Sequence, residues 1–192
     1  MRWAPQTGAC YIGRADCRWR HDERTEDRRV NVIIVGCGRV GAELAKILEK
    51  DGHMVTILDK NGDAFARLAE GMTATKVVGD GTDMETLVRA GIKSADAFVA
   101  VTNGDNRNIM AAQIAQTMFE VPNVVCRIYD PLRQKTYKAL GLRSISPTIV
   151  GAKLLRNDLY YPDGQATSPD RAIAAGDAVP LANPKQGSAA KQ

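Results

Sequence analysis

The sequence predicts an α/β protein of the Rossmann type, a three-layer sandwich around a six-stranded parallel sheet in the order 3-2-1-4-5-6. Short, nearly continuous apolar segments alternate with helical patterns, as in parallel sheets covered on both faces. The first apolar segment leads directly into a Gly-x-Gly-x-x-Gly turn. Glycines repeatedly follow the last apolar residue of a predicted helix, where a left-handed cap is expected. Right-handed crossovers between parallel strands then give the strand order.

The first predicted strand, residues 30–35, runs into the glycine turn. Gly36 permits a tight turn, Gly38 lets a pyrophosphate approach the backbone, and Gly41 lets the next helix pack closely on the strand. That helix is expected over about 39–51, and the free N–H groups at its start favour phosphate. Its apolar residues are expected on one buried face: Val40, Leu44, Ile47 and Leu48.

The second predicted strand, residues 54–58, ends at Asp59, which lies 18 residues after Gly41. A carboxylate in this position can accept hydrogen bonds from ribose hydroxyls, and it disfavours NADP because it would repel the 2′-phosphate. Strand, glycine triplet, helix, strand and acid in this order predict a nucleotide site. The same pattern also fits a Rossmann unit whose site is vestigial or empty.

The remaining elements alternate in the same way and are bounded by glycine, proline or capping residues. They are expected as helix 61–70, strand 75–78, a helix from its cap Thr82 to Gly91, strand 97–101, helix 106–119, strand 124–128, a helix from Pro131 to Gly141, strand 143–145 and a last helix 147–159. The apolar residues expected in the core from the second and third helices are Phe65, Leu68, Ala69, Met72, Met84, Leu87 and Val88.

The chain of 192 residues is expected to form one domain, residues 30–160, between two tails. Residues 1–29 carry seven arginines and five acidic residues without an apolar segment. They are expected to be a disordered extension, or sequence from an upstream start codon or an expression vector, and not a secretory signal. Residues 161–192 are rich in Pro, Gly, Ala, Ser and Gln and are expected to be a flexible tail.

Composition argues against several classes of protein. No apolar stretch approaches the ~20 residues that cross a bilayer. The net charge of +4 is spread along the chain without a basic run among aromatic residues, so nucleic acid is not expected as a partner. Cys10, Cys17 and His21 lack a fourth ligand and a standard zinc spacing, so no metal is expected. Cys37 and Cys126 are expected to be buried thiols of a reducing compartment.

A second candidate motif, Gly79-Asp80-Gly81, follows the third predicted strand, at the sheet edge where ligands of open α/β sheets bind. Asp80 could meet an adenine edge or a ribose. Alternatively, Thr82 and Asp83 merely cap the next helix.

Polar residues also follow the fourth predicted strand, over 102–108. They could bind phosphate or a metal, or simply begin a helix. Arg127 lies within the fifth predicted strand, and its buried charge needs a partner, for which a phosphate or a carboxylate is expected. Arg39 could fold back on the phosphates, reach a neighbouring chain or remain solvated.

Catalytic machinery is not apparent. The chain has neither the P-loop pattern Gly-x-x-x-x-Gly-Lys-[Ser/Thr] nor the Gly-x-Ser-x-Gly elbow. Of the two histidines, His21 falls in the N-terminal extension and His53 at the sheet end away from the cofactor. A dehydrogenase also needs a substrate domain, and the 32 residues after position 160 are too few to build one. A binding protein is therefore expected, not an enzyme.

Residues 30–160 resemble the N-terminal lobe of the regulator-of-potassium-conductance family, found in the cytoplasmic Trk/Ktr-type subunits of bacterial potassium uptake systems. The resemblance covers about two thirds of the chain. The motifs that carry it are GCGRVG at 36–41, Asp59, VVGDGTD at 77–83, AVTNGDNRN at 100–108 and CRIYDP at 126–131.

The resemblance implies a dimer-forming cytoplasmic domain that binds an adenine nucleotide (ATP, ADP or AMP) or NAD(H) and gates a separate membrane pore. It assigns the three glycines of the turn to the phosphates, Asp59 to the ribose and Asp80 to the adenosine end. It places Thr102 and Arg127 near the phosphates, and Arg39 where it can reach phosphate across the dimer. The full set of candidate nucleotide-binding residues is Gly36, Cys37, Gly38, Arg39, Val40, Gly41, Asp59, Lys60, Gly79, Asp80, Gly81, Thr102, Asn103 and Arg127.

The chain departs from the family pattern twice. Asn106 stands where a Glu usually follows the Asp of the 102–108 loop, which weakens any claim of a carboxylate-held cation. The usual second lobe, a small α+β ligand-binding unit, is not expected within residues 161–192. The apolar residues of the last helix are therefore expected to need another chain. They are Ile149, Val150, Leu154, Leu155 and Leu159.

These observations lead us to expect a homodimer or larger even-numbered assembly that associates with a potassium-transporter membrane subunit at the inner face of the plasma membrane. Two other functions fit the sequence. One is an NAD-dependent oxidoreductase or a fragment of one, and the other is a free-standing nucleotide- or redox-sensing module.

Overall fold

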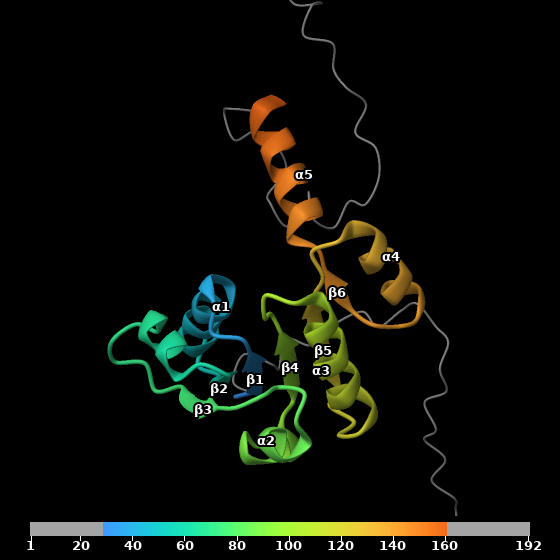
Figure 1. Cartoon of the computed structure of the whole chain (residues 1–192). Coiled ribbons are helices and arrows are strands. Elements are labelled where there is room, and N and C mark those ends of the chain that lie inside the picture. The colour runs from blue at the N-terminus through green and yellow to red at the C-terminus, as the bar shows by residue number, and fades with distance from the viewer. Residues whose placement is uncertain (1–28, 161–192) are drawn as a thin grey trace, which may run out of the picture.

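A computed structural model of the chain describes residues 29–160 (Figure 1). These residues form a parallel sheet of six strands in the order β3-β2-β1-β4-β5-β6, which confirms the predicted Rossmann order. The strands are β1 (Asn31–Val35), β2 (Met54–Asp59), β3 (Thr75–Val78), β4 (Ala97–Ala100), β5 (Asn123–Arg127) and β6 (Ser144–Ile145). The helices are α1 (Arg39–Lys50), η1 (Gly62–Arg67), α2 (Met84–Arg89), η2 (Ile92–Ser94), α3 (Asp105–Thr117), α4 (Pro131–Ala139) and α5 (Pro147–Tyr160). The two predicted tails, with Cys10, Cys17 and His21, fall almost entirely outside the described residues.

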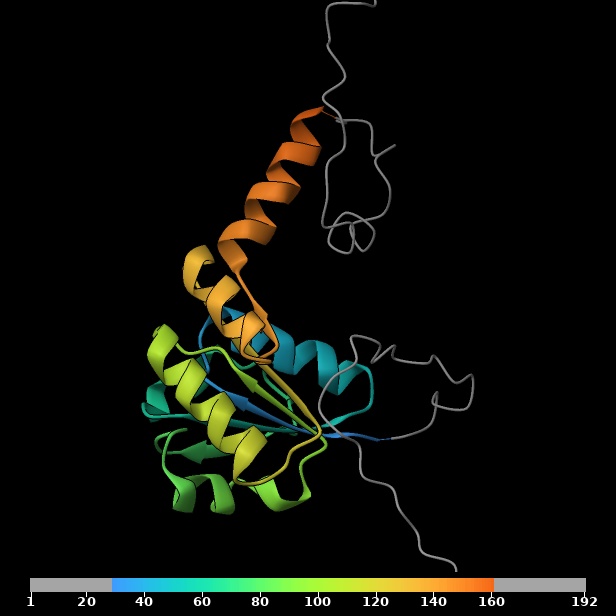
Figure 2. The ribbon, with the colours of Figure 1, turned by 90° about the vertical axis from the view of Figure 1, so that its right-hand side faces the viewer.

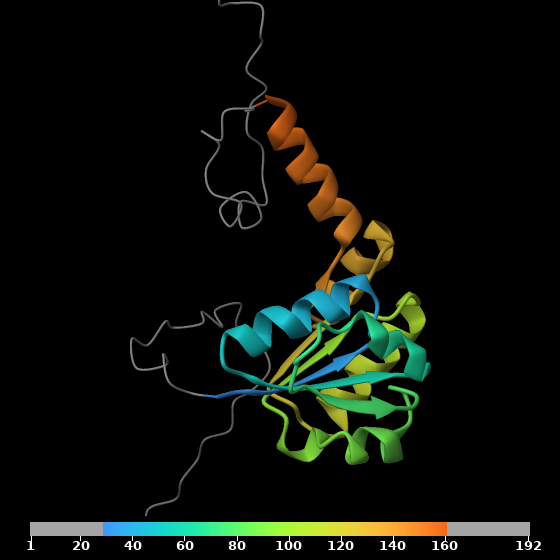
Figure 3. The same cartoon turned by 90° about the vertical axis from the view of Figure 1, so that its left-hand side faces the viewer.

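Helices cover both faces of the sheet. Figures 2 and 3 show α1 on one side and α2 on the other. Successive strand side chains point to opposite faces, so Val32 and Ile34 join a core with α1 and η1. Ile33 and Val35 join the core formed with α2, η2 and α3. Burial on both faces explains why the strands read as nearly continuous apolar segments.

The second predicted helix, 61–70, is shorter than expected. It is a 3₁₀ helix, η1, which ends at Arg67 and is followed by Leu68, whose backbone is already extended. Asn61 begins it by accepting a hydrogen bond from the N–H of Asp63 at 3.0 Å. Such a short segment forms no more than a few i→i+3 turns. Ala64 and Leu68 are buried as part of the core, whereas Ala69, expected there, is exposed.

The cap of α2 is Asp83, so the prediction of Thr82 was wrong. The Asp83 carboxylate accepts hydrogen bonds from the N–H and hydroxyl of Thr86 at 3.0 and 2.6 Å. A carboxylate at this position accepts a hydrogen bond from a free helix N–H, and its negative charge interacts favourably with the positive end of the helix dipole. Thr82 instead donates its hydroxyl to Asp80 at 2.8 Å.

Several apolar helix residues predicted to be in the core are exposed. On α1, Val40 and Ile47 are 47% and 49% exposed, and the residues turned to the sheet are Gly41, Ala42 and Ala45. Small side chains face the sheet here because the helix packs closely behind the glycine turn. Met84 and Val88 of α2 are likewise exposed.

The last helix, α5, projects away from the sheet beyond β6 and α4 (Figure 1). Leu155 and Leu159 are 68% and 82% exposed, so these apolar side chains are not covered by the other residues of the described range 29–160. Among residues 29–160, no helix has both the length and the apolar character required to cross a membrane.

Candidate functional site

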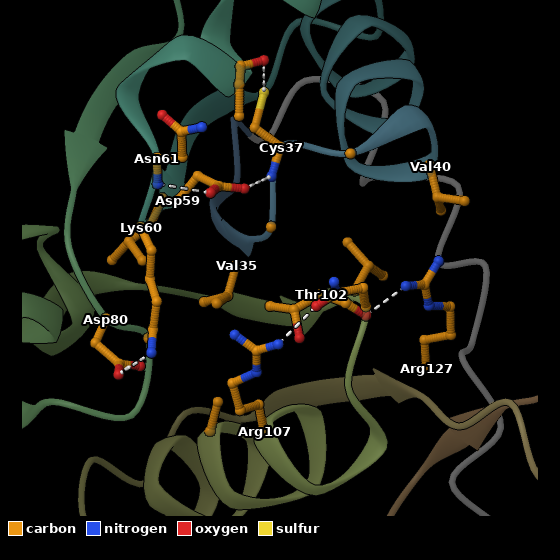
Figure 4. A pocket seen from close by; sticks show the side chains of 18 of the residues that line it. Val35, Cys37, Val40, Asp59, Lys60, Asn61, Asp80, Thr102, Arg107 and Arg127 are labelled. Carbon is orange, nitrogen blue, oxygen red and sulfur yellow. Dashed lines mark hydrogen bonds and ion pairs between the residues drawn. The ribbon is translucent and has the colours of Figure 1, made fainter.

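The candidate residues lie around a cavity of about 610 Å³ at the carboxyl end of the sheet (Figure 4). The glycine turn after β1 and the segments after β2, β3, β4 and β5 contribute to its wall. All of the predicted nucleotide-binding residues line this cavity except Gly41. The topology thus brings together motifs that are separated by up to about 90 residues in the sequence.

The three glycines of the turn have different roles. Gly36 has a φ of +107°, and a Cβ on it would lie 2.9 Å from the N of Thr102. A Cβ on Gly41 would lie 1.9 Å from the carbonyl oxygen of Gly36, so this glycine lets α1 approach the turn. A Cβ on Gly38 would meet nothing within 4 Å, and this residue is exposed on the cavity wall. Gly38 is therefore the glycine that leaves space for a ligand.

The start of α1 has no acceptor of its own. Gly38 occupies the N-cap position without a side chain to accept from the first N–H groups, and no acidic residue lies in the first turn. Free N–H groups and the positive end of the helix dipole favour an anion at such a terminus. Gly38, Arg39 and Val40 all line the cavity at this point.

Asp59 connects the end of β2 to the glycine turn. Its Oδ2 accepts a hydrogen bond from the N–H of Cys37 at 2.7 Å, and its Oδ1 accepts from the N–H of Asn61 at 2.9 Å. A carboxylate has about four acceptor positions, so both oxygens can also accept from ribose hydroxyls. Asp59 therefore shapes the turn in addition to offering the predicted ribose contact.

Cys37 is a buried thiol, as predicted, and its Sγ donates to the carbonyl of Ala64 at 3.3 Å. Burial, and then the charge of Asp59, raise the pKa of the Cys37 thiol. The uncharged thiol is therefore the dominant form near neutral pH.

Asp80 and Lys60 form an ion pair at one end of the cavity, with 2.6 Å between Lys60 Nζ and Asp80 Oδ2 (Figure 4). The other oxygen of Asp80 accepts from the N–H and hydroxyl of Thr82 at 2.9 and 2.8 Å. Burial alone would raise the pKa of Asp80, but the hydrogen bonds from Lys60 and Thr82 outweigh it and lower the pKa. Asp80 is therefore charged at neutral pH and lines the cavity, while its neighbour Asp83 caps α2.

Asn108 fixes the opposite end of the cavity. Its side chain is fully buried, and its Oδ1 accepts from the N–H and hydroxyl of Thr102 at 2.8 and 2.7 Å. Its Nδ2 donates to the carbonyls of Thr102 and Arg127 at 3.0 and 2.9 Å. The ends of β4 and β5 are thereby held together by one side chain whose hydrogen-bonding capacity is full.

Arg127 is the buried charge of the site, with 9% exposure. Its Nη2 donates to the carbonyl of Thr102, and its guanidinium lies 4.3 Å from the centre of the Tyr129 ring. Within residues 29–160 its partners are thus a carbonyl and an aromatic face. The carboxylate alternative is not found among these residues, and a phosphate stays a prediction. The Nε of Arg127 is buried and has no hydrogen-bond partner within residues 29–160. A buried donor without an acceptor is costly, so Arg127 is suited to bind an anionic ligand.

The 102–108 loop mainly begins a helix. α3 starts at Asp105, and Asn106 accepts a hydrogen bond from Arg133. In the described part of the chain, no group of three or more His, Cys, Asp or Glu side chains is placed to hold a metal ion. The phosphate alternative remains open for Thr102 and Asn103, which line the cavity.

Sequence reasoning missed several residues that line the cavity: Asn61, Ala64, Arg67, Thr82, Arg107 and Tyr129. Arg107 donates to Asn103 Oδ1 at 2.6 Å from the first turn of α3. It belongs to a motif that already drew attention, so its place in the first helical turn was the available signal. Arg67 reaches the cavity from η1, which the sequence predicted as an ordinary helix turned to the core.

Among the described residues, the carboxylates that line the cavity lie on one side only. Asp59 ends β2 and Asp80 lies after β3, on the side that Lys60 and Arg67 also line. Arg107 and Arg127 lie on the β4 and β5 side, where no carboxylate of residues 29–160 lines the cavity. A ribose and a base suit the first side, and phosphate suits the second. The one histidine among residues 29–160, His53, lies at the opposite end of the sheet.

Residues 32–147 match the model of the TrkA-N domain family. The Trk system potassium uptake protein TrkA of Streptomyces coelicolor is 46% identical over 117 residues, which are 61% of this chain and 52% of that protein. A Trk system potassium uptake protein TrkA homolog of Methanothermobacter thermautotrophicus is 34% identical over 132 residues, 68% of this chain and 61% of that protein. The chain therefore spans about half to three fifths of the length of these relatives.

Solved structures share the fold. The Kef C-terminal domain of Shewanella denitrificans, in an AMP-bound form, superposes with a TM-score of 0.61 at 24% identity, covering 76% of this chain and 88% of that one. The GsuK channel bound to NAD gives a TM-score of 0.54 at 21% identity, with 65% and 23% covered. GsuK bound to ADP gives 0.52 at 20% identity, with 63% and 32% covered.

Proposed function

Because the chain belongs to the TrkA-N domain family, we propose that it binds an adenine nucleotide or NAD(H) and regulates a Trk/Ktr-type potassium uptake system. The observation that carries the proposal is the composition of one cavity. It combines a bare glycine turn, a carboxylate at the end of β2 and a buried arginine whose Nε lacks an acceptor within the described residues. Relatives named as potassium uptake proteins, and similar folds holding AMP, ADP or NAD, support the same function.

The proposed ligand lies across the carboxyl end of the sheet. Its ribose meets Asp59, and its base lies toward Asp80 and the adjoining Lys60. Its phosphates pass Gly38 and the start of α1 toward Arg127. The cavity of about 610 Å³ lies within the ~300–1,000 Å³ typical of small-molecule sites. The carboxylate of Asp59 disfavours a 2′-phosphate, so NADP(H) should bind much less tightly than NAD(H).

We propose binding without turnover. None of the described residues that line the cavity is a histidine, and the buried Cys37 thiol has a raised pKa. The carboxylates of Asp59 and Asp80 already accept hydrogen bonds from the glycine turn and from Lys60 and Thr82. We therefore assign them to holding the site and the ligand, not to proton transfer. Sustained hydride transfer from NADH to a small carbonyl substrate, abolished by Asp59→Ala, would instead support the oxidoreductase alternative.

The proposed regulator acts in an assembly. The exposed apolar side chains of α5, including Leu154, Leu155 and Leu159, would be covered in a homodimer or larger even-numbered assembly. Arg39 is exposed at the start of α1, where it could reach a phosphate bound to a neighbouring copy. We propose further that this assembly associates with a potassium-transporter membrane subunit on the cytoplasmic side and that the bound nucleotide controls its pore.

Potassium uptake in cells tests the function directly. A strain lacking the gene should take up potassium or rubidium more slowly, and the wild-type gene should restore uptake. Asp59→Ala should fail to restore it, because the ribose contact and the support of the turn are lost. Glu43→Ala serves as the control, because Glu43 lies on the exposed side of α1 and pairs only loosely with Lys46 at 3.7 Å. Unchanged uptake after deletion of the gene would contradict the proposal.

A further inference from the structure

We propose that the segment Arg127–Tyr129 couples nucleotide occupancy of the cavity to the position of α5. The inference rests on the proposed nucleotide binding and concerns its regulatory output. It assigns Tyr129, Ser146 and Thr148 a role in transmitting the bound state, although neither Ser146 nor Thr148 lines the cavity.

Tyr129 contacts Arg127 of the cavity wall through its ring and the start of α5 through its carbonyl oxygen. Its ring lies against the guanidinium of Arg127, 4.3 Å from ring centre to Cζ, and both residues line the cavity. Its carbonyl oxygen accepts hydrogen bonds from the hydroxyls of Ser146 and Thr148 at 3.2 and 3.1 Å. These two residues flank Pro147, the first residue of α5. A residue that stacks on the ligand-facing arginine is therefore hydrogen-bonded directly to the first turn of the last helix.

The base of α5 is tied to the sheet around this contact. Ser146 is 1% exposed, and its carbonyl accepts the N–H of Val150 at 3.0 Å, so the helix begins at the residue that binds Tyr129. The N–H of Ile128 donates to the carbonyl of Ile145 at 3.0 Å, which joins the end of β5 to β6. Beyond this base, Figures 2 and 3 show α5 extending away from the sheet. The junction with Tyr129 therefore governs the direction in which α5 leaves the domain.

The neighbouring main chain is held in place. Asn108 binds the carbonyls of Thr102 and Arg127, and Asp105 accepts from the N–H of Tyr129 at 2.9 Å. The side chain of Arg127, in contrast, is shared between the Thr102 carbonyl and the Tyr129 ring, and its Nε lacks an acceptor among residues 29–160. Arg127 is thus the group whose interactions change most when an anion enters.

A ligand shifts a conformational equilibrium only through interactions that differ between the two states. An anion that binds the Arg127 guanidinium from the cavity supplies such a difference, because it holds the guanidinium and with it the stacked Tyr129 ring. A more firmly held Tyr129 in turn stabilises its two hydrogen bonds to the start of α5. We therefore expect nucleotide binding to slow hydrogen exchange in the first turns of α5.

Hydrogen–deuterium exchange on the full chain, stripped of nucleotide, tests the coupling with ADP and, separately, with NADH as probes. In the wild type, the ligand should slow exchange both in the turn at 36–41 and in α5. In the double variant Ser146→Ala/Thr148→Val, the turn should keep its protection and the Kd should stay within about twofold, since neither side chain lines the cavity. The response of α5 should disappear.

Ser144→Ala is the matched control. It removes a hydroxyl two positions before Ser146, and the Ser144 hydroxyl has no hydrogen-bond partner within residues 29–160. This variant should keep both responses. If the double variant does not fold, Thr148→Val alone, at an exposed position, should still reduce the response of α5. Light scattering on each sample separates a change of assembly from a change within the chain.

The outcomes separate the two proposals. Protection of the turn without any response in α5 of the wild type would overturn the coupling and leave nucleotide binding standing. A full response of α5 in the double variant or in Thr148→Val would also overturn the coupling. If neither ADP nor NADH protects the turn at 36–41, the proposed nucleotide binding itself is contradicted, and the coupling falls with it.

Discussion

Two glycine substitutions in the same turn should separate folding from ligand binding. Gly41→Ala would place a methyl group 1.9 Å from the carbonyl oxygen of Gly36, where ordinary contacts begin near 3.4 Å. The turn or α1 would therefore have to move by roughly 1.5 Å. Gly36 cannot yield easily, because a Cβ-sized space beside it is already occupied by the backbone of Thr102.

Overpacking of a buried site costs about 1–3 kcal/mol, and a clash with main-chain atoms belongs at the upper end. Alanine inside a helix recovers about 1 kcal/mol relative to glycine. We therefore expect Gly41→Ala to lower the free energy of unfolding by about 2 kcal/mol, or roughly 6–10 °C in Tm for a domain of this size.

Gly38→Ala is the matched change. A Cβ at Gly38 meets nothing within 4 Å, and its φ of −80° is accessible to alanine. Alanine is a poorer N-cap than glycine but restricts the unfolded chain, so stability should change by less than about 1 kcal/mol. The methyl group would project into the proposed phosphate path and should weaken nucleotide binding at least about tenfold, or ~1.4 kcal/mol.

Thermal unfolding and calorimetric titration of both variants provide the measurement. A Gly41→Ala protein as stable as the wild type would refute the packing argument. A Gly38→Ala protein that binds nucleotide with wild-type affinity would refute the assignment of this glycine to the ligand.

Four further predictions concern single side chains. Asp59→Ala should weaken adenine-nucleotide binding by about 1–3 kcal/mol in calorimetry, the loss expected for a charged hydrogen-bond partner; unchanged affinity would remove Asp59 from the site. Burial raises the pKa of the Cys37 thiol, and it raises the pKa of the Cys126 thiol to about 11. Iodoacetamide at pH 8 should therefore leave both thiols unmodified in the native protein and alkylate both in urea. Rapid alkylation of either thiol in the native protein would show that the thiol is not buried. Because the pKa of Asp80 is lowered, its contribution to stability is present at neutral pH and is lost as pH falls through the folded-state pKa. The Tm of Asp80→Asn should therefore fall less on acidification than that of the wild type. Parallel curves of Tm against pH for the two proteins would refute this. Leu155→Asp should lower the mass of the assembly in light scattering at tens of micromolar; a wild-type monomer, or an unchanged mass in the variant, would argue against α5 as the interface.

The fold was predictable because each local signal agreed with the sheet. The apolar strands, and the glycines that follow the predicted helices, indicated where strands and helices alternate. Right-handed crossovers between parallel strands then allowed only one strand order. The helical faces were less predictable. Val40 and Ile47 have the spacing of a buried stripe yet are exposed, because the close approach of α1 to the sheet selects Gly41, Ala42 and Ala45 instead. Periodicity reports which residues share a face, not which face meets the sheet.

The lining of the cavity could be predicted from the sequence where it is formed by residues at strand ends. The prediction failed for side chains that reach the cavity from the following helix or loop. Asp59 and Asp80 could be placed because Asp59 ends β2 and Asp80 lies two residues after β3. Arg107 and Tyr129 reach the cavity from the start of a helix and from a loop, so their positions depend on helix orientation. The stacking of Arg127 on Tyr129 likewise joins two side chains whose directions the sequence does not specify.

Calorimetric titration of the nucleotide-stripped chain with ADP, ATP, AMP, NADH and NADPH is the most direct test of nucleotide binding at this cavity. We expect saturable binding of at least one adenine nucleotide or of NADH, much weaker binding of NADPH, and loss of affinity in both Asp59→Ala and Gly38→Ala. Absence of binding by all of these ligands in folded protein, or binding that neither substitution weakens, would show that the cavity is not a nucleotide site.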